Sequence, residues 1–274
     1  MKRSLALIVA LAPLAAAAEC RYTAQHDFDV DAAGLNTLAL ELGSSDAAVE
    51  GVPGLAKVEV RARACASEES WLAGLGVDQQ RSGDRLTVTP RRERHASWQW
   101  FGSSYAYVDL KVRVPAALAV AIKASSGDAD VRNVAALDFT ASSGDLAVDR
   151  IAGALGIEVS SGDAKGGDVG SVDVRRTGSG DITLRNVRGD VAVARAGSGD
   201  LQFDTVGGSV HIGRVGSGDV TVERVQRDVS IDAIGSGDIR AVDVGGDFSV
   251  RTKGSGDVYH RDVRGAVSLP QRRD

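Results

Sequence analysis

The sequence predicts an all-β protein built as a single-chain β-solenoid, and three observations carry that prediction. The tetrapeptide [SG]SGD occurs eight times in the second half of the chain, and successive copies are separated by 17 to 19 residues. Between the copies, aliphatic residues recur at every second position, which is the periodicity of a strand with one buried face. The chain also has 33 Gly but only 5 Phe, 4 Tyr and 3 Trp. Regular repetition with so few aromatic rings indicates a thin, stacked core.

Each repeat predicts one coil made of two short strands and two turns. In the unit that begins at Gly199, Leu201 and Phe203 alternate along a first strand, Val206 follows, and a second strand begins near Val210. The other units place apolar residues at nearly the same spacings from their own glycine. A coil this thin cannot bury its apolar face alone and must stack on its neighbours. We therefore expect a parallel rod with about 19 residues per coil.

The Ser-Gly-Asp turn is interpreted as a structural corner. Glycine supplies the positive φ that a sharp turn needs, and the Ser and Asp side chains bond nearby backbone N–H groups. The alternative is a cation site, because stacking places the carboxylates about 5 Å apart. Backbone donors, arginines or bound cations must offset their repulsion. We expect structural turns, with no metal or cofactor, at Gly127, Asp128, Gly144, Asp145, Gly162, Asp163, Gly180, Asp181, Gly199, Asp200, Gly218, Asp219, Gly237, Asp238, Gly256 and Asp257.

The first 18 residues have the pattern of a secretory signal peptide. Lys2 and Arg3 precede the apolar run Leu5–Ala18, which ends in three alanines. We predict cleavage after Ala18 and export to the periplasm, the cell surface or the medium. No later stretch has the length and hydropathy of a transmembrane segment. The formal net charge of −5 argues against a nucleic-acid partner.

The two cysteines, Cys20 and Cys65, are predicted to form a disulfide. An exported chain enters an oxidising compartment in which thiols pair. The bridge would close a loop of roughly 45 residues and stabilise the fold by about 3 to 4 kcal/mol.

Residues 19–115 are predicted to form a β-rich N-terminal cap region that carries this disulfide. Strands are expected at residues 37–42, 58–64, 85–89 and 108–114, and one short helix from Ser67 to Leu75 with Ser67 as its N-cap. Residues 43–46 resemble a degenerate ninth copy of the repeat. The solenoid with its eight SGD turns spans residues 116–270, and residues 271–274 are a polar tail that closes the last coil together with His260.

An aromatic and basic cluster precedes the solenoid and is the candidate binding surface. Such a loop can stack on sugar rings or bind anionic polymers and protein partners. The alternative is that the rings cover the open end of the solenoid core. The cluster consists of Arg91, Arg92, Arg94, Trp98, Trp100, Phe101, Tyr105 and Tyr107.

The SGD turns, together with residues 112–115 and the entry Ala124-Ser125-Ser126-Gly127-Asp128, resemble the bacterial DUF4097 family of putative adhesins, which is related to the DUF2807 head domains. The resemblance covers roughly residues 35–270. It implies an exported solenoid of the right-handed parallel β-helix type, and it brings no catalytic residues.

The function expected from the sequence is non-catalytic. We predict an adhesin-like binding or structural protein of the cell envelope or extracellular space. Its expected partner is a cell-envelope component, a glycan or a protein, and the chain is expected to be a monomer. Two alternatives stay open: a polysaccharide-active enzyme on a β-helix scaffold, and a cation-binding solenoid that uses the stacked Asp turns. A glycosidase generally needs a pair of carboxylates at a defined separation, whereas the regular turns account for the aspartates without catalysis.

Overall fold

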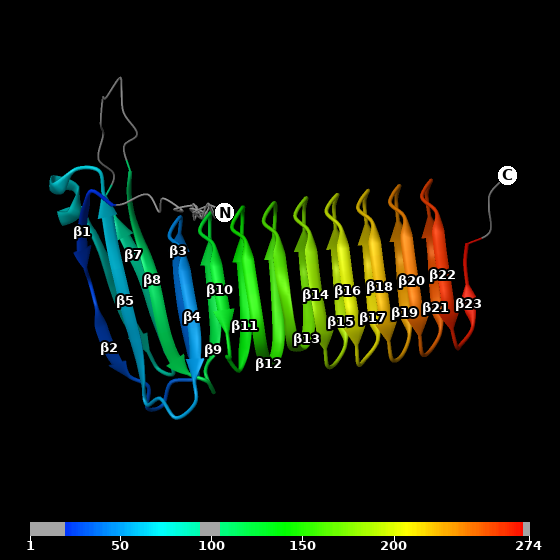
Figure 1. The fold of residues 1–274 in the computed structure, drawn as a ribbon, viewed down its shortest axis with the longest axis horizontal. Coiled ribbons are helices and arrows are strands. Elements are labelled where there is room, and N and C mark those ends of the chain that lie inside the picture. The colour runs from blue at the N-terminus through cyan, green and yellow to red at the C-terminus, as the bar shows by residue number, and fades with distance from the viewer. Residues whose placement is uncertain (1–19, 94–104, 271–274) are drawn as a thin grey trace, which may run out of the picture.

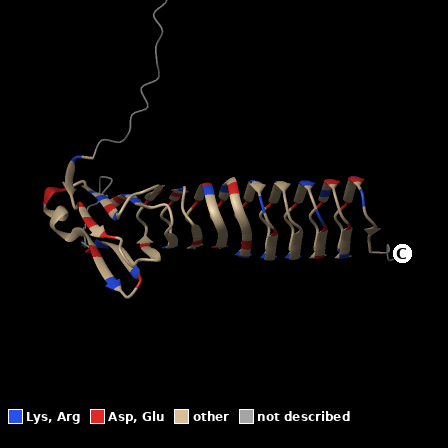
Figure 2. Ribbon diagram, turned by 90° about the horizontal axis from the view of Figure 1, so that it is seen from below, with Lys and Arg blue, Asp and Glu red and all other residues tan. Residues whose placement is uncertain are grey.

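A computed structural model describes residues 20–93 and 105–270, and in it stacked parallel coils form a long rod (Figure 1). The predicted β-solenoid is therefore confirmed. The predicted signal peptide at 1–18 and the polar tail at 271–274 lie outside the described residues. Acidic and basic residues are interspersed along the rod (Figure 2).

The coils form two layers of strands, here called layers A and B. Two long strands, β12 and β13, bend from layer A into layer B and so belong to both. In order along the rod, layer A contains β8 (Ala106–Pro115), β4 (Ala47–Val52), β10 (Ala129–Arg132), β12 (Leu146–Val159), β13 (Ala164–Thr177), β14 (Ile182–Val187), β16 (Leu201–Val206), β18 (Val220–Val225), β20 (Ile239–Val244) and β22 (Val258–Val263). Layer B contains β7 (Arg85–Arg92), β3 (Thr37–Gly43), β9 (Ala119–Ala124), β11 (Ala136–Ala141), the ends of β12 and β13, β15 (Val191–Ala196), β17 (Val210–Val215), β19 (Val229–Ile234), β21 (Phe248–Lys253) and β23 (Val267–Ser268).

The core lies between the two layers and consists of the aliphatic columns read from the repeats. In one coil, Leu201, Phe203 and Val206 point inward and are almost completely buried, while Gln202 is exposed. In-register parallel pairing stacks each inward residue on its counterpart in the next coil, as Phe203 does on Val222. The inward residues of layer A face those of layer B. These stacked apolar residues fill the space between the layers and exclude water from it.

The first coils are not stacked in chain order. β3 lies between β7 and β9, and β4 lies between β8 and β10, all in parallel pairs. The earlier pair β3 and β4 thus forms the second rung, and the later pair β7 and β8 forms the first. Residues 43–46 make the turn between β3 and β4, so the degenerate ninth copy of the repeat is confirmed as part of the stack.

Beyond the first rung, antiparallel strands close this end of the rod. β5 (Lys57–Ala66) pairs with β8, and β1 (Tyr22–Gln25) and β2 (Phe28–Asp31) pair with β5. β6 (Leu75–Ser82) forms a hairpin with β7. The Cys20–Cys65 disulfide is present and ties the start of the described chain to β5.

The short helix differs from the prediction in type and in cap. η1 is a 3₁₀ helix over Glu69–Gly74, its N-cap is Glu68, and no side chain caps it. Ser67 does not cap the helix. Its hydroxyl accepts a hydrogen bond from the N–H of Tyr105 at 3.3 Å, so the segment before β8 competes for the same side chain.

The glycines of the SGD turns serve a different purpose from the one predicted. Positive φ is found at eight non-glycine residues instead, each six positions after an SGD glycine: Asn133, Arg150, Asp168, Asn186, Thr205, Arg224, Asp243 and Asp262. A Cβ on Gly199 would overlap the carbonyl oxygen of Gly180 in the preceding coil, and the other SGD glycines are placed in the same way. The turn needs glycine because neighbouring coils approach too closely for any side chain.

The aspartates of these turns form a ladder that links the coils. The Oδ1 atom of Asp200 accepts a hydrogen bond from the backbone N–H of Asp219 at 2.8 Å, 19 residues further on. The same bond recurs at 2.8 to 2.9 Å along the rod from Asp46 to Asp257. The expectation of local Asx turns is therefore corrected: the carboxylates bridge successive coils. Hydrogen bonds from the backbone N–H groups therefore offset the repulsion between the stacked carboxylates.

Removing one carboxylate of the ladder should weaken the stack at one junction. We expect Asp200→Ala to lower the free energy of unfolding by about 1 to 2 kcal/mol, because the N–H of Asp219 loses its acceptor. Asp200→Asn keeps an Oδ1 acceptor and should lose less than half as much. Asp173→Ala, at an exposed outward position of β13, serves as the control. Urea unfolding measures all three, and equal losses for the Ala and Asn variants would contradict this role.

Candidate functional site

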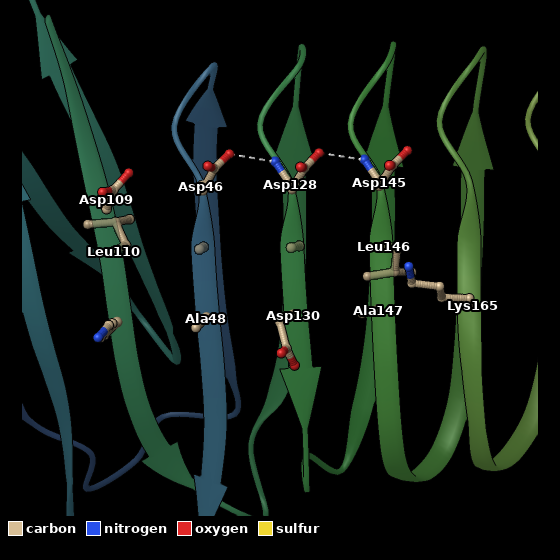
Figure 3. A pocket seen from close by; sticks show the side chains of 13 residues that line it. Asp46, Ala48, Asp109, Leu110, Asp128, Asp130, Asp145, Leu146, Ala147 and Lys165 are labelled. Carbon is tan, nitrogen blue, oxygen red and sulfur yellow. Dashed lines mark hydrogen bonds between the residues drawn. The ribbon is translucent and has the colours of Figure 1, made fainter. Parts of the chain in front are cut away.

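A groove runs across the outer face of layer A near the closed end of the rod (Figure 3). It crosses five neighbouring strands, β8, β4, β10, β12 and β13, and its volume is about 470 Å³. That volume lies in the range of small-ligand sites. The lining residues are Asp46, Ala47, Ala48, Asp109, Leu110, Lys111, Asp128, Ala129, Asp130, Asp145, Leu146, Ala147 and Lys165.

The groove exists because two outward positions carry alanine. Parallel register aligns Lys111, Ala48, Asp130, Ala147 and Lys165 as one row across the face. In a strand these outward side chains stand roughly perpendicular to the sheet. The two alanines therefore leave hollows between taller charged neighbours, with a lysine at each end of the row.

Carboxylates line the upper edge of the groove in Figure 3, where the Asp ladder begins. Asp46 accepts from the N–H of Asp128, and Asp128 accepts from the N–H of Asp145, both at 2.9 Å. Asp109 occupies the corresponding position on β8, since the next residues, Leu110 and Ala47, are register partners. Its carboxylate stands outside this ladder and faces the groove.

The Asp109 carboxyl is held in an environment that disfavours its charge. Burial raises the pKa of Asp109 above its ordinary value of 3.8, and the nearby charge of Asp46 raises it further. Arg63 and Lys111 oppose the shift. A ligand that offers a cation or hydrogen-bond donors would stabilise the charged form of Asp109, so the groove is suited to such a ligand.

Asp109→Asn should stabilise the protein at neutral pH. Because the pKa is raised on folding, ionised Asp109 costs stability above its folded pKa. This cost fades as pH falls through the folded pKa, and it is absent well below the ordinary value, where Asp109 is protonated in both the folded and the unfolded state. We expect the variant to melt at a higher temperature than wild type at pH 7, with the difference shrinking at pH 3. Asp173→Asn is the control, and a gain that is equal at both pH values would contradict the assignment.

The residues predicted from the sequence as a binding surface lie partly beside this groove. Tyr105 precedes β8 and Tyr107 lies on it, and their rings are 6.1 Å apart. Tyr107 points outward on the same side of β8 as Asp109. Burial raises the pKa of Tyr107, and the charge of Asp109 adds to that effect. The remaining described members, Arg91 and Arg92, are exposed at the end of β7.

Four members of the predicted cluster lie outside the described residues: Arg94, Trp98, Trp100 and Phe101. In the sequence they lie between β7 and β8. The tyrosines also adjoin the disulfide, because the hydroxyl of Tyr107 lies 3.4 Å from the Sγ atom of Cys20.

Sequence reasoning did not find the groove. Its floor depends on which strands become neighbours, and β4 and β12 are separated by β10, whose partners come from distant parts of the chain. The available signal was the outward alanine at 48 and at 147, in a position where most coils carry a longer polar side chain. That signal becomes visible only when the repeats are aligned with the first half of the chain.

Two further features bear on possible chemistry. Within residues 20–93 and 105–270, no group of three or more His, Cys, Asp or Glu side chains is arranged to hold a metal ion. In the same part of the chain, the structure contains no helix with the length and hydropathy needed to span a membrane.

Comparison with solved structures gives matches over most of the chain at low identity. A putative adhesin from Bacteroides fragilis is 12% identical and covers 91% of this chain and 98% of its own, with a TM-score of 0.42. A putative lipid binding protein from Parabacteroides distasonis is 13% identical and covers 92% and 98%, also with a TM-score of 0.42. A putative cell adhesion protein from Clostridium sporogenes is 11% identical and covers 92% and 100%, with a TM-score of 0.32.

Comparison with curated proteins gives no match. The family model described as Toastrack DUF4097 matches residues 57–259, which include most of the rod and the groove residues outside β4 and its preceding turn. The chain belongs to the DUF4097 family.

Proposed function

We propose that this protein is an exported, non-catalytic binding protein of the bacterial cell envelope or extracellular space. In this proposal, a polar ligand, a glycan or a protein segment, occupies the groove in layer A. The groove with Asp109 at its edge is the observation that carries the proposal. Burial disfavours the charged form of this half-buried carboxylate and so costs stability. A carboxylate in such an environment is typical of a binding position.

Export is supported by the disulfide and by the signal-peptide pattern. Disulfides persist in oxidising compartments and are rare in the cytosol. We propose cleavage after Ala18 and release to the periplasm, the cell surface or the medium. Intact mass measurement of the protein purified from the envelope tests the cleavage site, and a chain that keeps residues 1–18 would contradict it.

A non-catalytic role is supported by what the ladder does with its carboxylates. Asp46, Asp128 and Asp145 each hold a backbone N–H of the next coil. They are therefore part of the scaffold, and moving protons through them would disturb the stack. We extend the proposed binding surface from the groove to Tyr107 and Tyr105 and to the loop that follows Arg92.

The test is binding of purified protein to immobilised peptidoglycan, lipopolysaccharide and envelope protein fractions. We expect saturable binding to one fraction. Ala48→Arg/Ala147→Arg fills the groove and should weaken that binding at least tenfold. Gln202→Arg is the matched control, because Gln202 lies in the same outward row further along the rod. Binding that the groove variant retains in full would overturn the groove as the site.

Two further arms separate the alternatives. Trp98→Ala/Trp100→Ala tests the loop: unchanged binding would leave the groove as the surface without it. Release of reducing sugar ends from a bound glycan would favour the polysaccharide-active enzyme. A melting temperature that rises with calcium and falls with a chelator would favour the cation-binding solenoid, because a ligand that binds only the folded state stabilises it.

A further inference from the structure

The two ends of the rod differ in how they are finished. At the first rung, β5, β1 and β2 extend layer A, and Trp71, Leu72 and Phe28 pack against the core. At the other end, the last strands are β22 and β23, and large apolar side chains are exposed. Tyr259 is 48% exposed and Val267 is 41% exposed, whereas Phe248, one coil earlier, is 0% exposed.

The hydrogen-bonding pattern is also interrupted at this end. β22 pairs with β20, and β23 pairs with β21, so each has one unpaired edge in the described chain. The Asp ladder ends at Asp257, whose own N–H is bonded to Asp238. Every earlier carboxylate of the ladder points along the rod to a donor in the next coil. The carboxylate of Asp257 points to the place where that coil would be.

The described chain leaves this end of the rod open. No described strand pairs with the free edge of β22 or of β23. Cys20 is fixed by its disulfide to β5, at the opposite end. These two edges and the core between them are therefore available to an occupant.

We propose that this occupant is a second copy of the chain, joined end to end through antiparallel pairing of β22 with its counterpart. A twofold axis perpendicular to the two layers continues layer A into layer A and layer B into layer B. The apolar columns of the two rods then meet. Head-to-tail stacking is disfavoured because the first rung is already covered by β5 and its neighbours.

Charge complementarity selects the register of the pair. With the axis at Tyr259, inward residues oppose inward residues, and Asp257 of each copy opposes Arg261 of the other. Opposite charges directly across an antiparallel pair are stabilising. Among the described residues of its own copy, Arg261 forms an ion pair only with the adjacent Asp262, and both side chains are more than half exposed. The two ladders end on opposite sides of the axis, so their last carboxylates do not repel each other.

The contact is small, and the dimer should be concentration-dependent. Two strand edges and the core between them bury less surface than a standard stable interface. We expect monomer at low micromolar concentration and dimer as the concentration rises, measured by sedimentation velocity on the chain with its disulfide intact.

A charge exchange tests the pairing. Arg261→Asp should weaken dimerisation at least tenfold, because it places Asp257 opposite another carboxylate. Asp257→Arg/Arg261→Asp should restore it, and the backbone N–H of residue 257 that bonds to Asp238 is kept in both variants. Arg185→Asp is the matched control, since Arg185 holds the same column position in an interior coil and should leave dimerisation unchanged. A double variant that stays monomeric would overturn the register.

Cross-linking tests the axis directly. Both native cysteines are engaged in the disulfide, so Tyr259→Cys introduces the one free thiol of the described chain. On the twofold axis, it should link two copies under mild oxidation, whereas Thr183→Cys in an interior coil should not. A wild-type chain that stays monomeric up to millimolar concentration would overturn the proposal. A dimer that Tyr259→Cys does not trap would overturn the antiparallel pairing of β22.

Discussion

Replacing Gly199 with alanine is expected to lower the free energy of unfolding by at least about 3 kcal/mol. The new methyl group would overlap the carbonyl oxygen of Gly180, and it would also lie against backbone atoms that cannot rotate away. Relief requires the two coils to separate, which breaks the hydrogen bond from the N–H of Asp200 to Asp181 and the pairing of β14 with β16. Such a loss exceeds that of most single substitutions.

Gly83→Ala provides the control for this prediction. Gly83 has a φ of +60° in the hairpin between β6 and β7, and a Cβ there would meet no atom within 4 Å. Its cost is conformational only, about 1 to 2 kcal/mol. Urea unfolding followed by circular dichroism compares the two variants. A Gly199→Ala protein as stable as the Gly83→Ala protein would show that the coils can move apart freely, contrary to the close approach described.

Removing the disulfide should cost about as much as the Gly199 substitution. The bridge joins residues 45 apart in sequence, and opening a loop of that length returns about 3 to 4 kcal/mol of conformational freedom to the unfolded chain. The loss should be concentrated at the closed end, where β1 and β5 are held together. Reduction of the wild-type protein and the double variant Cys20→Ser/Cys65→Ser should both show it in urea unfolding.

Comparison of these two proteins isolates the covalent link from side-chain effects. Cys65 is completely buried, so serine there adds a packing cost that reduction does not. The reduced wild type is therefore the cleaner measure, and the Ser variant should be equally or less stable. If the oxidised and reduced proteins unfold at the same urea concentration, the bridge contributes nothing and this account of the closed end is wrong.

The repeat made the rod predictable. Columns such as Val191 and Val210 record which positions face inward, and equal spacing records that each coil stacks on the last. The strands at residues 37–42, 58–64, 85–89 and 108–114 were also predicted, since each has alternating apolar residues. Periodicity is the spacing of residues along the chain, so it can be recognised in one sequence without knowledge of tertiary contacts.

The order of the first rungs and the floor of the groove could not be read in the same way. Nothing near residues 37–52 shows that they insert between β8 and β10, because that choice depends on contacts between distant segments. The glycine role was misjudged for the same reason. A turn suggests positive φ, but the constraint on Gly199 comes from Gly180 in another coil. Only the stacked arrangement reveals it.

The uniform ladder also sets how the length of this molecule can change. Between Asp181 and Asp257 every junction repeats the same bond at a separation of 19 residues. Excising or duplicating one complete unit would bring together ends that already match, and the rod would shorten or lengthen by about 4.8 Å. Loss of a single residue would instead leave one coil mismatched with its neighbours, as in the shorter early units, where the pairing of β12 with β13 contains register shifts. The length of the rod can therefore be changed in steps of one whole coil, and such a change requires no new kind of contact between coils.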